Sequence, residues 1–250
     1  MENILVTGAS RGIGKATAVS LAREGRRLVL VSRSAGALEM TARDAEARGA
    51  KVDVHVCDLS RADHVGELLT AWPDLDGLVL NAGRANDKAF REAQIDEIAV
   101  ELRLNYETPL AILHHHLPRM TSRGVGCAVM VGSLTSYVPF PGNATYAASK
   151  SALYTLIRSL RLEMEHSGVG LGVVLPGFTR TQMTQDLQAP GPKMSAENVG
   201  HAVAKCYDRG GGIMVPGLMN GVAAMVFGAF PSTLDAMLMR FDSVVPKPRA

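Results

Sequence analysis

Tyr146 and Lys150, in the stretch "YAASK", are the residues whose types and spacing most directly suggest chemistry. On an α-helix, positions i and i+4 lie one above the other on the same face, so the phenol and the ammonium group would point into the same space. A neighbouring cation favours the ionised phenol and brings its pKa nearer to neutral pH, where proton transfer is efficient. Such pairs also occur by chance, so this one indicates catalysis only together with other motifs.

A glycine-rich turn, "TGASRGIG", follows the first predicted strand. Gly8, Gly12 and Gly14 let the backbone turn tightly and approach a pyrophosphate, whose charge would be met by free N–H groups and the positive end of a helix. The spacing is G-x-x-x-G-x-G, which differs from the G-x-G-x-x-G fingerprint of many dinucleotide-binding folds. At the start of a long strand and helix alternation, the turn predicts a dinucleotide-binding loop.

The end of the second predicted strand indicates which dinucleotide would bind. NAD-binding versions of such folds carry an acidic residue there, about 20 residues beyond the loop, which accepts hydrogen bonds from the adenosine ribose. Here the strand ends in Ser32 and Arg33, without a carboxylate. Arg33, with Arg11 from the loop, could form charged hydrogen bonds to a 2′-phosphate. We therefore expect NADP(H) rather than NAD(H), the alternative being that both arginines are solvated surface charges.

Short apolar runs recur along the chain and are separated by segments of helix length. They predict seven strands, at residues 3–6, 28–31, 52–56, 77–81, 127–131, 171–175 and 213–215. This alternation is typical of βαβ units, in which helices cover both faces of a parallel sheet. The expected fold is α/β: a single doubly wound domain over residues 1–250 with a seven-stranded parallel sheet. Residues 216–250 would form an apolar C-terminal extension of that domain.

Local signals predict where some helices begin and end. Ser60 to Asp63 has the Ser-x-x-Asp pattern of a capping box, and Ser195 precedes Glu197 in the first turn of a later helix. Pro118 is expected near a helix end, where its missing N–H does least harm.

Four motifs together give the sequence a close resemblance to the short-chain dehydrogenase/reductase family: "TGASRGIG", "NAG" at 81–83, "GS" at 132–133 and "YAASK". They follow the order and spacing of that family from about residue 3 to residue 181. The resemblance implies a single Rossmann-type domain that moves a hydride between a nicotinamide and a carbonyl or alcohol carbon.

The resemblance also implies a role for each catalytic candidate. Tyr146 would be the general acid of carbonyl reduction, and Lys150 would bind the nicotinamide ribose and depress the pKa of the tyrosine. Ser133 resembles the hydroxyl that polarises and orients the substrate carbonyl, most strongly as negative charge develops on that oxygen. Asn105 matches the asparagine that helps to hold a water in the proton relay to Lys150, although by itself it would be an exposed polar residue of a helix.

Cofactor contacts are carried over from the family in the same way. Asp58 stands where the family contacts the adenine ring, although by itself it is a turn residue, and Thr181 resembles the residue that binds the nicotinamide carboxamide. The predicted cofactor-binding residues are Gly8, Ser10, Arg11, Gly12, Ile13, Gly14, Ser32, Arg33, Asp58, Leu59, Asn81, Ala82, Gly83, Tyr146, Lys150, Pro176, Gly177, Thr179 and Thr181.

Composition and charge argue against several classes of function. The net charge of +2 is too small for a nucleic-acid partner, and 47% hydrophobic residues with 20% charged residues are ordinary for a soluble globular enzyme. A strand pattern that begins at the second or third residue leaves no room for a leader peptide. We therefore expect a cytoplasmic protein.

Neither the cysteines nor the clustered histidines predict a metal site. The three cysteines are far apart and lack metal-ligand spacing, which fits a reducing compartment. His114, His115 and His116 are consecutive, and consecutive residues of a helix point about 100° apart. Because the three side chains cannot converge on one ion, we expect no metal.

The C-terminal region is unusually apolar. No charged residue occurs from Gly210 to Leu234, and the stretch includes "GLMNGVAAMVFGAF". Pro216, Asn220 and several glycines argue against a membrane span. An apolar helix must bury itself, so three placements remain open: over the substrate pocket or a subunit interface, on a membrane surface as a peripheral contact, or in the core.

The same region departs from the common tetrameric members of the family, whose chains finish soon after the last strand. We expect a homodimer through the helix that carries Leu153, Leu156, Ile157 and Leu160, because this helix has apolar positions on more than one face. A tetramer is the alternative.

Together these features predict NADPH-dependent reduction of a ketone or aldehyde to an alcohol, or the reverse. The apolar extension, the methionines between 183 and 239 and the stretch "SYVPFPG" favour a hydrophobic small-molecule substrate. Two alternatives remain. One is an NADP(H)-binding regulator without turnover, against which Ser133, Tyr146 and Lys150 argue, and the other is an isomerase or lyase that uses bound nicotinamide transiently.

Overall fold

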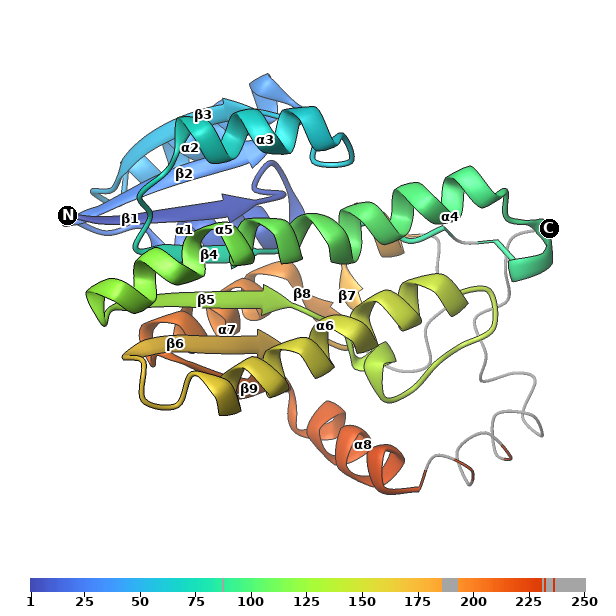
Figure 1. Cartoon of the computed structure of the whole chain (residues 1–250). Coiled ribbons are helices and arrows are strands. Elements are labelled where there is room, and N and C mark those ends of the chain that lie inside the picture. The colour runs from blue at the N-terminus through green and yellow to red at the C-terminus, as the bar shows by residue number, and fades with distance from the viewer. Residues whose placement is uncertain (87, 186–192, 231, 233–235, 237–250) are drawn as a thin grey trace.

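The computed structural model describes residues 1–86, 88–185, 193–230, 232 and 236 (Figure 1). Its centre is a sheet of seven parallel strands in the order β3-β2-β1-β4-β5-β6-β9. In chain order these strands are β1 (Glu2–Thr7), β2 (Arg26–Ser32), β3 (Lys51–Val56), β4 (Gly77–Leu80), β5 (Gly126–Val131), β6 (Val169–Val174) and β9 (Gly211–Met214). Every predicted strand is present, and the prediction of one Rossmann-like α/β domain is confirmed.

Helices cover both faces of the sheet. They are α1 (Gly12–Leu21), α2 (Ala35–Glu46), α3 (Ala62–Ala71), α4 (Ile95–Leu102), α5 (Thr108–Arg123), α6 (Ala144–Glu163), α7 (Ala196–Asp208) and α8 (Leu218–Ala229). Apolar side chains of α1, α2 and α7 share one buried cluster with the sheet, and those of α3, α5 and α6 share another. Figure 1 shows α5 and α6 on the near face of the sheet and α1 and α7 behind it.

The strand order explains where a site can form. The chain runs from β1 outward to β2 and β3, and then returns to β4 on the other side of β1. At such a switch point the loops after neighbouring strands turn to opposite faces and leave a crevice at the carboxyl ends of the strands. The glycine loop follows β1 and the "NAG" motif follows β4, so both lie at this crevice.

One predicted helix cap is wrong and another is confirmed. The backbone N–H and the hydroxyl of Ser60 both donate to Oδ1 of Asp58, at 3.0 and 2.7 Å, so Ser60 closes a turn with the stronger acceptor instead of capping a helix. As a result α3 begins at Ala62, after Arg61. Ser195 does cap α7, because its Oγ accepts from the backbone N–H of Asn198 at 3.1 Å.

Pro118 does not lie near a helix end, in contrast to the prediction. It is inside α5, which continues to Arg123 and ends at Gly124, whose φ is +64°. Pro118 and His114 are both on the exposed side of α5, where water can satisfy the carbonyl that Pro118 leaves without a donor.

Several short elements have no counterpart in the sequence prediction. Two strands of two residues, β7 (Thr179–Arg180) and β8 (Met194–Ser195), pair in parallel. Three 3₁₀ turns are η1 (Phe90–Glu92), η3 (Leu134–Ser136) and η4 (Gln182–Thr184), and a π-helical turn, η2 (Arg103–Glu107), joins α4 to α5. They are too short to produce a periodic pattern in the sequence.

The apolar helix α8 is largely exposed, so these residues are not core. Leu218 is 84% exposed and Met225 is 76% exposed, and only Ala224 of this helix is buried. Within the described residues, α8 contributes nothing to the lining of the cavity presented below. Most of the predicted extension beyond Phe230 lies outside the described residues.

The helix predicted to form a dimer interface is partly committed to the core. Leu153 and Ile157 of α6 are fully buried within this chain, whereas Leu156 and Leu160 are half-buried. Only the latter two could contribute to a contact with another copy. The homodimer stays a prediction.

Candidate active site

The loop after β1 has the geometry that a phosphate-binding turn requires. Gly8 and Gly12 have φ values of +67° and +55°, which a residue with a side chain adopts only with strain. A Cβ on Gly14 would lie 2.1 Å from the carbonyl oxygen of Gly8, so only glycine fits there. Arg11, the residue before α1, does not cap the helix with its side chain. It therefore leaves the first N–H groups of α1 available to bind an anion.

Thr7 and Asn81 brace this loop against β4. The hydroxyl of Thr7 accepts from the backbone N–H groups of Asn81 and Ala82, at 2.9 and 3.1 Å. The amide Nδ2 of Asn81 donates back to the carbonyl of Thr7 at 3.0 Å. Asn81 was predicted near the cofactor, but Thr7 was not identified, although it opens the "TGASRGIG" motif.

The far end of the site lies at the ends of β2 and β3. Ser32 is buried, whereas Arg33 is exposed beside it and lines the same cavity as Asp58 and Leu59. Burial would raise the pKa of Asp58, but the hydrogen bonds from Ser60 and the charge of Arg33 outweigh it and lower that pKa. Asp58 therefore remains a carboxylate at neutral pH, and it fixes a turn as well as lining the cavity.

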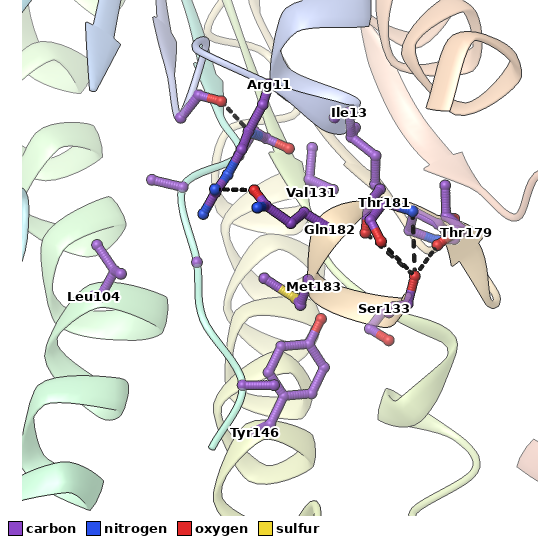
Figure 2. A pocket seen from close by; sticks show the side chains of 18 of the residues that line it. Arg11, Ile13, Leu104, Val131, Ser133, Tyr146, Thr179, Thr181, Gln182 and Met183 are labelled. Carbon is purple, nitrogen blue, oxygen red and sulfur yellow. Dashed lines mark hydrogen bonds between the residues drawn. The ribbon is translucent and has the colours of Figure 1, made fainter. Parts of the chain in front are cut away.

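Arg11 reaches across the cavity instead of toward Arg33. Its guanidinium donates to the side-chain oxygen of Gln182 in η4, as Figure 2 shows. This contact joins the phosphate loop to the segment after β6, which sequence reasoning did not anticipate. Gln182 is not part of a recognisable sequence motif.

Tyr146 and Lys150 lie one turn apart in α6, as predicted. Lys150 is only 4% exposed, and its ammonium group donates to the carbonyl oxygen of Val131 at 2.9 Å. The Nζ atom is 5.6 Å from the centre of the Tyr146 ring. Burial lowers the pKa of Lys150 to about 8, against the charge of Glu101, which raises it.

Ser133 follows β5 and lies across from Tyr146. Its Oγ accepts the backbone N–H of Thr135 at 3.2 Å, which orients the side chain and leaves its own hydrogen free to be donated. In Figure 2 the hydroxyl of Tyr146 is on the side of Ser133 and Met183. Two hydroxyls at the wall of one cavity can hydrogen-bond a single substrate oxygen.

Asn105 is fully buried, in the π-helical turn η2, and is not the exposed helix residue that it would be if read alone. Its Nδ2 donates to the carbonyl of Arg84 at 2.8 Å and to the hydroxyl of Ser149 at 3.2 Å, and its Oδ1 accepts from the N–H of Arg84 at 2.9 Å. Both amide hydrogens are therefore used within the protein. The side chain holds the "NAG" loop against α6, and its predicted part in a water relay remains a prediction.

The segment after β6 closes the opposite wall. The carbonyl of Pro176 accepts from the N–H of Leu134 at 2.8 Å, and the hydroxyl of Thr179 donates to the carbonyl of Gly177 at 3.0 Å. Thr181 begins the turn η4 through its contacts with Thr184. These bonds hold the predicted nicotinamide-binding residues beside Ser133.

A cavity of about 510 Å³ joins these parts, a size typical of ligand pockets. All of the predicted catalytic and cofactor-binding residues line it except Gly14, which is behind the loop, and Asn105, which is behind Gly83. The lining also contains residues that no motif identified, among them Cys57, Leu104, Phe178, Gln182 and Met183. Phe178 could have been found, because it stands inside "PGFTRT".

A sequence profile described as short chain dehydrogenase matches residues 2–191, which is most of the chain. The chain belongs to the short-chain dehydrogenase family. A ketoacyl reductase, HetN, from Nostoc sp. is 32% identical over 82% of this chain and 74% of its own.

Solved structures agree with this membership over the full chain. A short-chain dehydrogenase from Sphingobium yanoikuyae in complex with NADPH has a TM-score of 0.83 and 28% identity, covering 100% of this chain and 98% of its own. A bulky-bulky ketone specific alcohol dehydrogenase from Comamonas testosteroni has a TM-score of 0.80 and 26% identity, covering 100% of this chain and 97% of its own.

The residues present fit the nicotinamide cofactor that this family uses. The glycine loop leaves room for a backbone-bound pyrophosphate, and the cavity continues from there to Tyr146. Among the described residues, His, Cys, Asp and Glu side chains form no group of three that could hold a metal ion. No helix in this part of the chain is both long enough and apolar enough to cross a membrane.

Proposed function

We propose that this protein is an NADPH-dependent reductase that converts a hydrophobic ketone or aldehyde to an alcohol, or catalyses the reverse reaction. The observation that carries the proposal is one cavity lined by the glycine loop, Ser133, Tyr146 and Lys150. A regulator that only bound the cofactor would have no use for a buried lysine beside a phenol and a second hydroxyl.

The choice of NADP(H) follows from charge at the end of β2. Arg33 is exposed on the cavity wall, and neither Ser32 nor Ser34 beside it offers a carboxylate to a ribose. A guanidinium can bind a 2′-phosphate with charged hydrogen bonds, whereas an acidic residue would repel it. The NADPH complex of the Sphingobium relative supports the same choice.

The preference for a hydrophobic substrate follows from the wall around Tyr146. Phe140 and Phe178 lie with their ring centres 5.7 Å apart, and both line the cavity with Leu134 and Met183. Such a wall gains free energy by excluding water from an apolar group and offers a sugar few hydrogen bonds. The names of the two relatives, a ketoacyl reductase and a bulky-ketone dehydrogenase, support this preference.

The steps of carbonyl reduction would be shared by the cofactor and four side chains. The nicotinamide supplies the hydride when bound. Ser133 would donate a hydrogen bond to the carbonyl oxygen, and Tyr146 would donate the proton that this oxygen needs as negative charge develops on it. Lys150 would favour proton release by Tyr146 through its charge and would bind ribose hydroxyls, while Asn105 would fix the neighbouring loop.

The remaining parts of the proposal concern the setting of the enzyme. We expect a homodimer, with a tetramer as the alternative, and no nucleic-acid partner. Three free, buried cysteines, Cys57, Cys127 and Cys206, are compatible with the reducing cytoplasm. A peripheral membrane contact through the exposed face of α8 remains one of the placements that its apolar side chains allow.

The decisive experiment compares Tyr146→Phe with the wild type. Consumption of NADPH is measured against a panel of aliphatic, aromatic and ketoacyl carbonyls, with cofactor affinity measured separately. Loss of the phenolic hydroxyl should lower kcat by about 10²–10⁴-fold with the affinity retained, because only the proton donor is removed. Tyr154→Phe, on the same helix and outside the cavity lining, is the control and should retain activity.

Two results would contradict the proposal. If the wild type bound NADPH tightly but reduced no carbonyl in the panel, a regulator or an isomerase would explain the site better. If Tyr146→Phe kept full activity, another group would have to donate the proton.

A further inference from the structure

Glu101 is a buried carboxylate close to the reacting groups that no motif of the sequence explains. It is on α4 and has no exposed surface, although a charge without partners is costly to bury. Its two oxygens are both used. Oε2 accepts from the hydroxyl of Thr145 at 2.7 Å, and Oε1 accepts from the backbone N–H of Asn86 at 3.3 Å.

The bond to Thr145 acts on the first turn of α6, directly before Tyr146. Asn143, the residue that precedes this helix, makes no side-chain cap. The carboxylate of Glu101 instead reaches the helix N-terminus from α4 through Thr145. A negative charge near a helix N-terminus is favourable because it meets the positive end of the helix dipole.

The same carboxylate also acts on Lys150. Burial lowers the pKa of Lys150, and Glu101 is the charge that opposes this shift. Among the described residues, two uncharged groups lie beside the ammonium: the carbonyl of Val131 from β5, which accepts from it, and the backbone at Gly83, which Asn105 of η2 also approaches. Tyr146 is the titratable group on the same helix that faces Lys150.

We propose that Glu101 is a positioning residue, which holds the first turn of α6, with Tyr146, against α4 and places a buried negative charge at the helix that carries Tyr146 and Lys150. This role rests on the reductase function proposed above. It assigns to α4 an electrostatic function in proton transfer, in addition to its position beside the turn that carries Asn105.

The expected effect of removing the charge has a definite sign. A carboxylate stabilises the ammonium form of Lys150, so its loss makes the lysine release its proton at lower pH. The cationic lysine would then disappear earlier as pH rises. The alkaline limb of the reduction rate should therefore move to lower pH.

Three variants separate charge from structure. Glu101→Gln removes the charge, but its amide oxygen can still accept from Thr145. Thr145→Val removes the hydrogen bond and keeps the charge. Glu107→Gln, at an exposed residue only six positions further along, removes a carboxylate that pairs with Arg103 and is the matched control.

The first measurement needs neither cofactor nor substrate. Lysine labelled with ¹³C at Cε is followed by NMR over a pH titration of the whole protein, and the Lys150 signal is assigned with Lys150→Arg. In Glu101→Gln the midpoint should fall by about one pH unit. In Thr145→Val and Glu107→Gln it should stay where it is in the wild type.

The second measurement is the pH profile of kcat for the best carbonyl of the panel. Glu101→Gln should move the alkaline limb in the same direction as the NMR midpoint, whereas Thr145→Val should lower kcat without moving the limb. An unchanged Lys150 midpoint in Glu101→Gln would overturn the inference, and so would an equal shift in Glu107→Gln. Failure of Glu101→Gln to fold would overturn it in favour of a purely structural role.

The two proposals fail in different ways. If the wild type turned over no carbonyl, the reductase function would be wrong, yet the NMR titration would still show whether Glu101 sets the charge of Lys150. If turnover were present and the midpoint did not move, the function would stand and Glu101 would have no electrostatic part in it.

Discussion

Arg33, at the rim of the cavity, is the residue on which the expected cofactor preference depends. It is exposed, so its charge is screened by solvent and contributes little to folding. It lines the cavity at the end of β2, where a ribose 2′-substituent would be met. We therefore expect Arg33 to contribute to the choice of cofactor, and cofactor preference is the property that a substitution should change.

Arg33→Asp should reverse the cofactor preference. A hydrogen bond to a charged group is worth about 1.5–3 kcal/mol, so kcat/KM for NADPH should fall by about 10–150-fold, while NADH should be used better than by the wild type. Steady-state kinetics with both cofactors measures the ratio. Arg43→Asp, an equal charge change on the exposed side of α2, is the control. An unchanged ratio would mean that Arg33 is only a solvated surface charge.

At the scale of residues, the sequence predicted the site residues that can be recognised from their residue type and their spacing along the chain. Tyr146 and Lys150 are one turn apart on α6, so their proximity follows from helical geometry alone. Glu101 and Thr145 were missed because they meet across two helices, 44 positions apart in the chain. Thr7 was missed for the same reason, since its partner Asn81 follows β4, 74 positions further along the chain.

At the scale of elements, the strands were predictable because most of them are apolar runs, and strands buried on both faces need apolar side chains throughout. The edge strand β3 instead alternates, with Asp53 and His55 between valines, and is only partly buried. The capping prediction at Ser60 failed because Asp58, two residues earlier, competes for the same hydroxyl. The position of Pro118 was misjudged because a helix tolerates proline on its solvent side. Periodicity does not report such local competition.

The glycine loop gives a test of how tightly β1 and α1 are joined. Gly14→Ala would place a Cβ 2.1 Å from the backbone oxygen of Gly8, which cannot move without shifting the phosphate loop. We expect a loss of about 1–3 kcal/mol in the free energy of unfolding and weaker NADPH binding.

Gly36→Ala in α2 is the matched control. A Cβ there meets nothing within 4 Å, and alanine favours a helix over glycine, so stability should rise by up to about 1 kcal/mol. Denaturant unfolding and cofactor titration measure both variants. Equal stability of Gly14→Ala and the wild type would show that the loop adjusts without cost.

At the scale of the whole molecule, distant segments are joined by contacts that no local pattern shows. A Cβ on Gly200 of α7 would lie 2.6 Å from Ala16 of α1, so glycine allows these helices to pack closely. Arg26, buried at the opposite end of the sheet from the site, bonds to Glu2 at 2.7 Å and to Asp208 at 2.5 Å. These bonds join the first two strands to the end of α7. Because Arg26 is buried, removal of either carboxylate would leave its charge poorly paired and would destabilise the fold.

His116 gives the fold a predictable sensitivity to acid. It is 2% exposed on α5, and its Nδ1 has no hydrogen-bond partner among the described residues. Burial, with the charges of His115 and Arg119, lowers its pKa to about 4. In the unfolded chain a histidine has a pKa of about 6.5, so between these values the unfolded state binds a proton that the folded state does not.

Stability should therefore fall as pH decreases from about 6.5 to about 4, and His116 should account for about 2–3 kcal/mol of this loss. Urea unfolding at a series of pH values in this window measures the loss. His116→Gln, which cannot take up a proton, should flatten the dependence, whereas His114→Gln, on the exposed side of the same helix, should leave it as in the wild type. If His116→Gln lost stability in parallel with the wild type, the acid sensitivity would have to come from other groups, such as Asp208, whose pKa is lowered, despite burial, by its hydrogen bond from Arg26.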